Sequence, residues 1–290
     1  MECRNYYANL IHEQSGPDVP QLALLAGRNN MRANAIRWNI LFLLLLCAVC
    51  GVAASFPFVL SLYADKVAEA PLSVPLVLVL GLLQNSIILA VLIGIGLVLT
   101  AKTELPGAPL IEDGRAGRDV GQRVRAMISP SLLTGVLVGV VVLLMFAFLL
   151  RNELPQLPVG KAALMPVWKR LLLCFYGGLT EEIIMRIFAF SFLMWLLRKL
   201  LRTGNEAARS KVFWAANILL ALIFGLGHLG SVVPLMPVTF KIVLGALLLN
   251  GVASLAFTGL YMRRGLEASM LAHFVADFMI WVIGPSILHR

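Results

Sequence analysis

Charged residues are scarce in this chain. Asp, Glu, Lys and Arg make up 13% of its 290 residues, whereas 60% are hydrophobic. About a quarter of the residues of a soluble globular domain are charged, and the mean hydropathy of +0.88 is that of a membrane protein. The composition therefore excludes a soluble globular protein and predicts an all-α integral membrane protein.

Apolar runs long enough to cross a bilayer recur along the sequence. A spanning helix needs ~20 predominantly apolar residues, and each run reaches about that length. The runs cover roughly residues 38–63, 72–100, 128–150, 165–200, 212–230, 239–262 and 266–288. We therefore expect a bundle of about seven, and up to eight, transmembrane helices with an intramembrane polar cavity.

Lysine and arginine alternate between the segments that join these runs. They are frequent in the N-terminal tail and in residues 101–129, 198–211 and 263–264, and sparse in the other connections. Because basic loops stay on the cytoplasmic side, we expect the N-terminus in the cytoplasm and the C-terminus outside. The net charge of +9 then reflects topology and attraction to anionic lipid. No basic stripe with interleaved aromatic residues occurs, so we expect no nucleic-acid partner.

Cysteines are also few. Two of the four, Cys47 and Cys50, form a Cys-x-x-Cys pair, but the pair lies in the first apolar run, without a strand or a dithiol-fold context. We interpret them, with Cys174, as small hydrophobic residues buried in the membrane.

The first part of the chain carries little chemistry. Residues 1–37 are polar and predict a flexible cytoplasmic tail with a surface-lying segment near Leu22–Leu25. The first apolar run starts too late and is too long for a cleaved signal peptide, so we expect it to remain as an anchor. Residues 38–150 hold three runs without a charged residue or histidine in their interiors. We interpret them as a three-helix membrane scaffold.

Three charged residues lie within six positions in the interior of the fourth run: Glu181, Glu182 and Arg186. A charge at bilayer depth costs from ~3 kcal/mol to 10 or more, so such residues are usually functional. Glu182 and Arg186 are four positions apart with the acid first, the favourable order for an ion pair on a helix. Glu181 points about 100° away from Glu182, so its carboxylate is expected to stay free for chemistry.

The same run is about 35 residues long and has Gly177-Gly178 near its middle. Because small residues favour kinks, we expect the helix to break or kink there. Thr180 would then cap a new helical start, with the two glutamates in its first turn.

Histidine is rare as well, and only two of the four histidines lie inside apolar runs. His228 follows Phe224 by one turn, and His273 shares a helical face with Asp277. Carboxylates and imidazoles from three helices can converge inside a bundle and bind or activate water. The residues alone therefore indicate hydrolysis within the membrane.

At the α-helical rise of ~1.5 Å per residue, the candidate site residues lie at different depths in the membrane. His273 lies about 10 Å inside the cytoplasmic edge, Glu181 nearer the middle, and His228 towards the far end of its run. Straight helices do not bring them together. Helix tilt, the break at Gly177-Gly178, or a fifth helix that starts deeper must close the gap.

Three motifs, in order along the chain, resemble the CPBP family, which comprises CAAX prenyl endopeptidases and bacteriocin-processing (Abi) proteases. The resemblance covers roughly residues 165–284 and marks residues 165–288 as a CPBP-like catalytic membrane core. It implies an intramembrane glutamate protease or metalloprotease. The motifs are Glu181-Glu182-x-x-x-Arg186, Phe224-x-x-x-His228 and His273-x-x-x-Asp277.

The resemblance also implies a role for each residue. Glu181 and His228 would activate the attacking water. His273, with the last motif residue, would stabilise the oxyanion of the tetrahedral intermediate. Glu182 and Arg186 would hold the geometry of the site.

The last motif residue and the metal content are linked. Members of the family carry Asn or Asp at this position, and here it is Asp277. An ionised Asp cannot donate to an oxyanion, so it would orient His273, be protonated, or bind a metal. Glu181, His228, His273 and Asp277 are the candidate ligands for a divalent metal such as zinc. The sequence has no His-Glu-x-x-His helix or Cys cluster, which favours metal-free activation of water.

Structural interpretations of these polar residues stay open beside the catalytic one. Glu182 and Arg186 also suit a buried ion pair that fixes helix packing. Four intramembrane amides suit hydrogen bonds between helices: Gln84, Asn85, Asn217 and Asn250.

Three functions remain open for the chain as a whole. An intramembrane endopeptidase would act on a membrane-associated peptide, and a cavity open to cytoplasm and lipid would suit a prenylated CAAX-type substrate. A catalytically silent scaffold or immunity-type protein would bind a peptide without cutting it. An ion- or proton-coupled transporter is the third, although no paired repeat supports it. The expected partners are membrane lipid and a peptide or lipidated protein.

Overall fold

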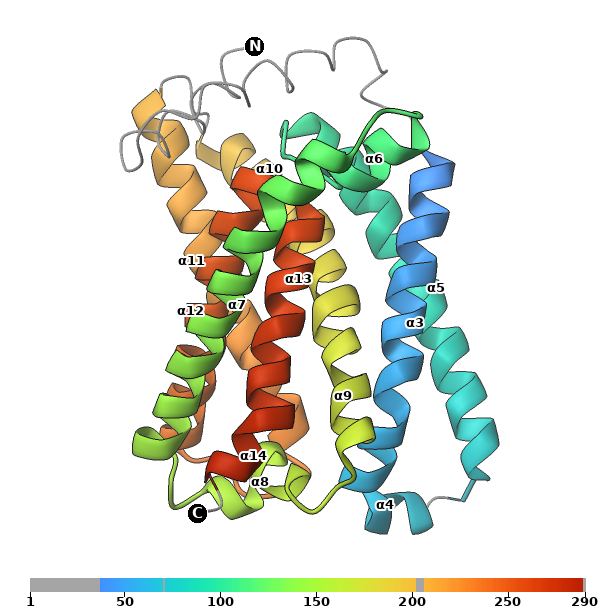
Figure 1. The fold of residues 1–290 in the computed structure, drawn as a ribbon, viewed down its shortest axis with the longest axis vertical. Coiled ribbons are helices and arrows are strands. Elements are labelled where there is room, and N and C mark those ends of the chain that lie inside the picture. The colour runs from blue at the N-terminus through green and yellow to red at the C-terminus, as the bar shows by residue number, and fades with distance from the viewer. Residues whose placement is uncertain (1–36, 70, 202–205, 289–290) are drawn as a thin grey trace.

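The protein is helical throughout the part that the computed structural model describes, residues 37–69, 71–201 and 206–288, and no strand occurs there. The helices stand side by side in one bundle (Figure 1). The predicted all-α membrane bundle is thus confirmed. The predicted tail, with its segment near Leu22–Leu25, lies outside the described residues, and the division into scaffold and catalytic core stays a prediction.

Six stretches of the described chain are long and apolar enough to cross a membrane. One of them, Leu266–Leu288, consists of α13 (Leu266–Asp277), the π-helix η4 (Phe278–Ile283) and α14 (Gly284–Leu288). The others are α3 (Trp38–Leu62), α5 (Val74–Lys102), α7 (Gly121–Leu149), α11 (Glu206–Val232) and α12 (Phe240–Arg264). They coincide with six of the seven predicted runs, and the chain is a multi-pass integral membrane protein.

The remaining predicted run is helical from Val167 onward but changes its type of helix. α9 (Val167–Phe175) leads into the π-helices η2 (Tyr176–Glu181) and η3 (Ile183–Phe190), and α10 (Ser191–Leu201) follows. Together these segments extend through the height of the bundle in Figure 1. The seventh membrane helix is therefore this π-rich segment.

The predicted break at Gly177-Gly178 is wrong, and so is the role of Thr180 as a helix cap. Both glycines lie inside η2, and the Thr180 hydroxyl donates to the Ala48 carbonyl on α3 at 2.7 Å. The long run is accommodated by π turns, which insert residues without ending the helix. Thr180 thereby ties this segment to α3.

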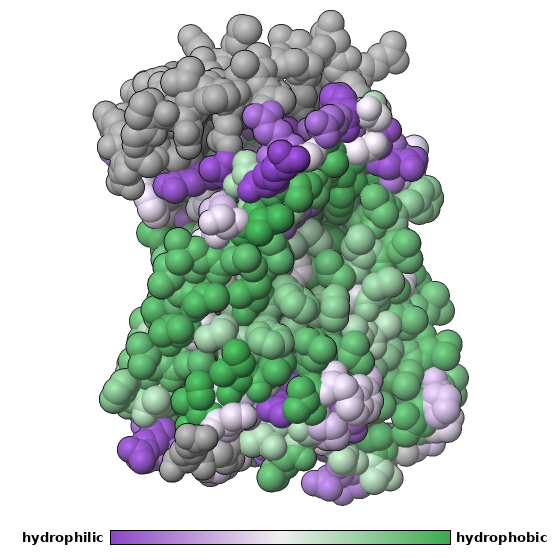
Figure 2. All heavy atoms as spheres, viewed as in Figure 1, coloured by the Kyte–Doolittle hydropathy of each residue, from purple (hydrophilic) through white to green (hydrophobic). Residues whose placement is uncertain are grey.

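Short helices lie at both ends of the bundle. The end that holds α6 (Pro109–Arg115) is called the α6 end here, and the opposite one, with α4 (Ala64–Ala68) and α8 (Pro158–Ala162), the α8 end (Figure 1). The 3₁₀ turn η1 (Leu154–Gln156) precedes α8. Figure 2 shows polar side chains at the two ends and an apolar band between them, as a lipid-facing surface requires.

α13 packs against α7, α12 and η2. Its contact with α7 is close because α7 presents Gly135 and Gly139. A side chain at Gly135 would collide with the Ala272 carbonyl, and one at Gly139 with Met279. Small residues allow such close helix packing in membranes. The contact fixes the helix that carries two of the predicted site residues.

Candidate active site

A buried ion pair forms the base of the site. Nε and Nη2 of Arg186 donate to the two carboxylate oxygens of Glu182 at 2.9 and 3.1 Å, and both side chains are fully buried. Nη1 of Arg186 donates to Thr258 Oγ1 on α12 at 2.7 Å. The predicted pairing is confirmed. Because the pair is bidentate and further hydrogen-bonded, it holds η3 firmly against α12.

His273 is held by the same glutamate. Its Nδ1 lies 3.0 Å from Glu182 Oε1, and since a carboxylate only accepts, Nδ1 carries a proton. The ring stacks on Phe257 with the centroids 4.8 Å apart. In this orientation Nε2 lies 3.7 Å from Glu181 Oε2 and 3.8 Å from Asp277 Oδ1. The buried pair therefore aims His273 at Glu181 and Asp277.

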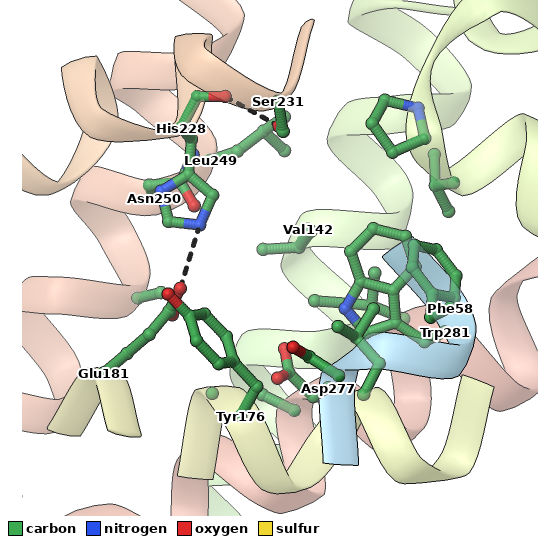
Figure 3. A pocket seen from close by; sticks show the side chains of 18 of the residues that line it. Phe58, Val142, Tyr176, Glu181, His228, Ser231, Leu249, Asn250, Asp277 and Trp281 are labelled. Carbon is green, nitrogen blue, oxygen red and sulfur yellow. Dashed lines mark hydrogen bonds and ion pairs between the residues drawn. The ribbon is translucent and has the colours of Figure 1, made fainter. Parts of the chain in front are cut away.

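His228 approaches Glu181 from α11. Its Nδ1 donates to the Phe224 carbonyl at 2.8 Å, so the neutral ring has a lone pair at Nε2. This Nε2 lies 4.0 Å from Glu181 Oε1 (Figure 3). Glu181 thus faces two imidazole nitrogens across gaps that are too long for direct hydrogen bonds and suit a bridging water molecule.

Exposure divides the six predicted residues into two groups. Glu182 and Arg186 are closed off from solvent, and the geometry supports a structural role for them. The other four side chains reach open space, with exposed fractions of 7% for His273, 13% for Asp277, 18% for Glu181 and 36% for His228. Only this second group can touch a substrate or an attacking water.

A cavity of about 450 Å³ adjoins these four residues. Most of its lining is aliphatic or aromatic, including Phe58, Val142 and Trp281 (Figure 3). Its carboxylates and imidazoles gather around Glu181 and His228. The predicted polar cavity is therefore polar at one end and apolar over most of its length, as small-molecule and peptide sites commonly are.

π-helices and glycines bring together residues that straight α-helices would hold at different depths. η2 and η3 surround the glutamates, and η4 begins directly after Asp277, so the register shifts on both sides of the site. A Cβ at Gly177 would collide with the Asp277 carboxylate and crowd His273 Nε2. The glycine pair is therefore needed for the close approach of η2 to α13, and not for a break.

Residues 163–279 match the family profile described as type II CAAX prenyl endopeptidase, Rce1-like. These residues are similar to the CPBP family of CAAX proteases. The matched residues, called the CPBP segment here, contain all six predicted site residues and confirm the resemblance. The family is one of intramembrane proteases that act on membrane-associated or prenylated substrates. No curated protein and no solved structure matches the chain significantly.

The four candidate metal ligands of the CPBP segment do not fit a zinc ion as they stand. Ligands ~2.0 Å from a tetrahedral zinc stand about 3.3 Å apart. Here Glu181 lies 4.0 Å from His228 and 3.7 Å from His273, and His273 lies 3.8 Å from Asp277. Within the described ranges, no group of three or more His, Cys, Asp or Glu side chains could hold a metal ion. The chemistry that the described residues support is that of acid and base groups.

Sequence reasoning missed several residues that line the cavity beside the CPBP motifs. Tyr176 lies five positions before Glu181, a spacing that shares a face only in a π-helix. Asn85 and Asn250 were expected to link helices, but each donates to a carbonyl of its own helix and lines the cavity. The buried Asn217 carbonyl oxygen has no hydrogen-bond partner in the described part. No signal in the sequence separates these positions from packing residues.

The substitution Gly177→Ala tests the close approach of η2 to α13. The added methyl would push Asp277 and His273 away from Glu181, and displacements of ~1 Å can cost about 100-fold in rate. We expect proteolysis to fall at least ~10-fold. Gly259→Ala is the matched control, because a Cβ there meets nothing within 4 Å. Equal activity of both variants, measured per mole of folded protein, would show that the close contact is unimportant.

Proposed function

We propose that the protein is an intramembrane endopeptidase in which Glu181 activates a water molecule. One observation carries this proposal. Glu181 stands at the polar end of an apolar cavity, with no lysine or arginine of the described chain in ion-pair distance, and faces the Nε2 atoms of His228 and His273 at 4.0 and 3.7 Å. A carboxylate without a lysine or arginine partner is available as a base.

The chemistry follows from these positions. Water in the gap between Glu181 and His228 loses a proton to the Glu181 carboxylate, and its oxygen attacks the carbonyl carbon of the scissile bond. The carbonyl π electrons move to the oxygen and form a tetrahedral oxyanion. The proton then passes to the amide nitrogen, the C–N bond breaks, and a carboxylic acid and an amine leave. His228 positions the water through its Nε2 lone pair.

His273 and Tyr176 are the proposed oxyanion donors. An imidazolium at His273 keeps Nδ1 on Glu182 and directs its second N–H into the cavity. Asp277, when ionised, only accepts hydrogen bonds, so it balances the charge of His273. The Tyr176 side chain extends towards Glu181 in Figure 3, and its hydroxyl is the second donor.

The substitution Tyr176→Phe tests the second donor. Loss of one oxyanion donor typically lowers kcat by about 100- to 1,000-fold, and we expect a fall of ~100-fold with little change in KM. Tyr261→Phe is the matched control, because Tyr261 is fully buried and accepts from the Gly107 amide at 3.2 Å, outside the cavity lining. An unchanged kcat for Tyr176→Phe would remove this residue from the mechanism.

A cleavage assay tests the substrate and the metal-free chemistry together. Purified protein is incubated with a fluorogenic prenylated Cys-a-a-X peptide and with its unprenylated twin, with and without a chelator. We expect cleavage of the membrane-partitioning peptide, insensitive to the chelator. Loss of cleavage on chelation and recovery with zinc would overturn the metal-free mechanism. Failure to cut either peptide would remove CAAX sequences as substrates.

We also propose that the α6 end faces the cytoplasm. Figure 2 shows hydrophilic side chains at this end, drawn at the top, and many of the residues there are basic. They include Arg115, Arg118, Arg123, Arg125, Arg198, Lys199, Arg263 and Arg264. The α8 end has fewer, and its Lys241 is paired with Glu153 at 3.0 Å. The distribution supports a cytoplasmic N-terminus and a C-terminus on the opposite side.

A further inference from the structure

A peptide that enters the cavity brings the hydrogen-bonding groups of its own backbone. Each residue other than proline carries one N–H and one C=O, and leaving such a group unpaired in apolar surroundings costs free energy. Most of the cavity lining is aliphatic or aromatic. The backbone of a bound substrate therefore depends on the few polar side chains of the lining for its partners.

Three hydroxyl groups of the lining are already used within the protein. Ser55 donates to the Val52 carbonyl at 2.7 Å. Tyr63 donates to the Ser231 carbonyl, and Ser231 to the His228 carbonyl, both at 2.8 Å. Because a hydroxyl has a single hydrogen to donate, none of the three can donate to a substrate without giving up its present bond.

Two amides of the lining keep a hydrogen to spare. Asn85 and Asn250 each donate one N–H to the carbonyl four residues earlier in the same helix, at 2.8 and 2.9 Å. A side-chain amide has two N–H donors and an acceptor oxygen, and neither amide makes a second hydrogen bond with any other described residue. Each therefore offers one donor and one acceptor, which is what a backbone peptide group requires.

Asn250 lies beside the histidine of α11. A Cβ at Gly225 would come within 3.0 Å of the Ala246 carbonyl oxygen, so the backbones of α11 and α12 touch at this level. The His228 ring folds back onto the Phe224 carbonyl and the Asn250 amide onto that of Ala246, which brings both side chains to the level of this contact. Figure 3 shows them next to each other. The spare groups of Asn250 thus lie close to the proposed reaction centre.

The helix that carries Asn250 contains none of the CPBP motif residues, yet it supports the site elsewhere. On α12, Phe257 stacks on His273, and Thr258 accepts a hydrogen bond from Arg186. Asn250 lies seven residues, about two turns, before Phe257. A peptide bound to Asn250 is consequently held by the same helix that orients His273, which fixes its position relative to the cleaving groups.

We propose that Asn250 binds a backbone peptide group of the substrate next to the scissile bond. Its spare N–H donates to a substrate carbonyl, and its carbonyl oxygen accepts from a substrate N–H. The cleavage rests on the proposed endopeptidase function, whereas the bond to Asn250 forms on binding, before any chemistry. Recognition of the backbone does not depend on the side chains of the substrate, and it suits a prenylated peptide as well as an apolar one.

A binding measurement tests the role of Asn250. The substitution Asn250→Leu removes both polar groups at similar volume, and the prenylated Cys-a-a-X peptide is bound in a Glu181→Gln background to prevent cleavage. We expect the Kd to rise ~10-fold. Gln84→Leu is the matched control, because Gln84 is an exposed amide of α5 outside the cavity lining, and its Kd should not change. An equal Kd for both variants would overturn the inference.

Ester analogues of the peptide distinguish a direct bond from a change in the shape of the cavity. In each analogue, an ester replaces one backbone amide beside the scissile bond, so that one N–H is lost. With Asn250 present, we expect one analogue to bind ~10-fold more weakly than the parent peptide. With Asn250→Leu, the same analogue and the parent should bind equally. An ester effect of the same size in both proteins would show that Asn250 makes no direct bond.

Cleavage is measured in parallel and separates this inference from the proposed function. In protein that retains Glu181, Asn250→Leu should raise KM and leave kcat nearly unchanged, since the bond is made before and during the reaction. If the ester effect depends on Asn250 and the wild type cuts no peptide, the binding role stands and the endopeptidase function fails. If the wild type cuts the peptide and Asn250→Leu alters neither Kd nor KM, the function stands and the inference is wrong.

Discussion

Glu181→Gln is expected to abolish peptide cleavage while the protein remains folded. The amide has nearly the shape of the carboxylate but cannot accept a proton from water, and general base catalysis contributes about 100- to 10,000-fold. We expect kcat/KM to fall by ~1,000-fold or more. Glu181 is partly exposed and outside the buried ion pair, so the midpoint of thermal unfolding in detergent should stay close to that of the wild type.

The control for this substitution is Glu153→Gln. Glu153 is also a glutamate, but it pairs with Lys241 at the α8 end of the bundle, away from the motifs. Its loss should leave kcat/KM within about twofold of the wild type, since such partly exposed pairs contribute little. Retention of wild-type cleavage by Glu181→Gln would refute the proposed mechanism, and equal losses in both variants would point to a general defect.

Arg186→Ala is expected to have the opposite effect, a loss of the fold. Glu182 and Arg186 are fully buried and bonded to each other, to Thr258 and to His273. Removing one partner of a buried pair costs about 3–5 kcal/mol because the remaining charge has no compensation. A fall of this size should sharply lower the yield of monodisperse protein and its unfolding midpoint. Arg115→Ala, at an exposed position, should change neither.

A double substitution separates the effect of one uncompensated buried charge from the effect of losing both charged side chains. Glu182→Leu with Arg186→Met removes both charges together, and such replacements are often neutral for stability. We expect the double variant to fold better than Arg186→Ala but to cleave poorly, because His273 then has no partner for Nδ1. Wild-type stability of Arg186→Ala would contradict the structural role. Full activity of the double variant would show that Glu182 does not orient His273.

The fold was largely predictable because hydropathy is a one-dimensional signal. Each membrane helix must satisfy its backbone polar groups internally, so apolar length alone located all seven helical segments. The Glu182–Arg186 pair was predictable for a similar reason, since four residues make one helical turn. The depths that were counted along straight helices did not bring His228 and His273 together. The count assumes the same α-helical rise for every residue of the chain.

The shape of the site depends on features that the sequence does not encode in any single motif. The π-helices around Glu181 and after Asp277 shift the register of both segments, and this places Tyr176 beside Glu181. Gly177-Gly178 resembled a break in sequence, whereas only the position of α13 shows why side chains are excluded there. The cavity is lined by residues from all seven membrane segments at once, so its shape depends on how they pack together.

Hydrolysis in ¹⁸O-labelled water tests the central claim most directly. Full-length protein in lipid vesicles is incubated with a pool of prenylated and apolar membrane peptides, and the products are read by mass spectrometry beside Glu181→Gln and Glu153→Gln. We predict new C-termini that carry one ¹⁸O atom with the wild type and Glu153→Gln, and none with Glu181→Gln. Labelled products at equal rates from Glu181→Gln, or no labelled product from the wild type with any peptide, would contradict a Glu181-activated endopeptidase.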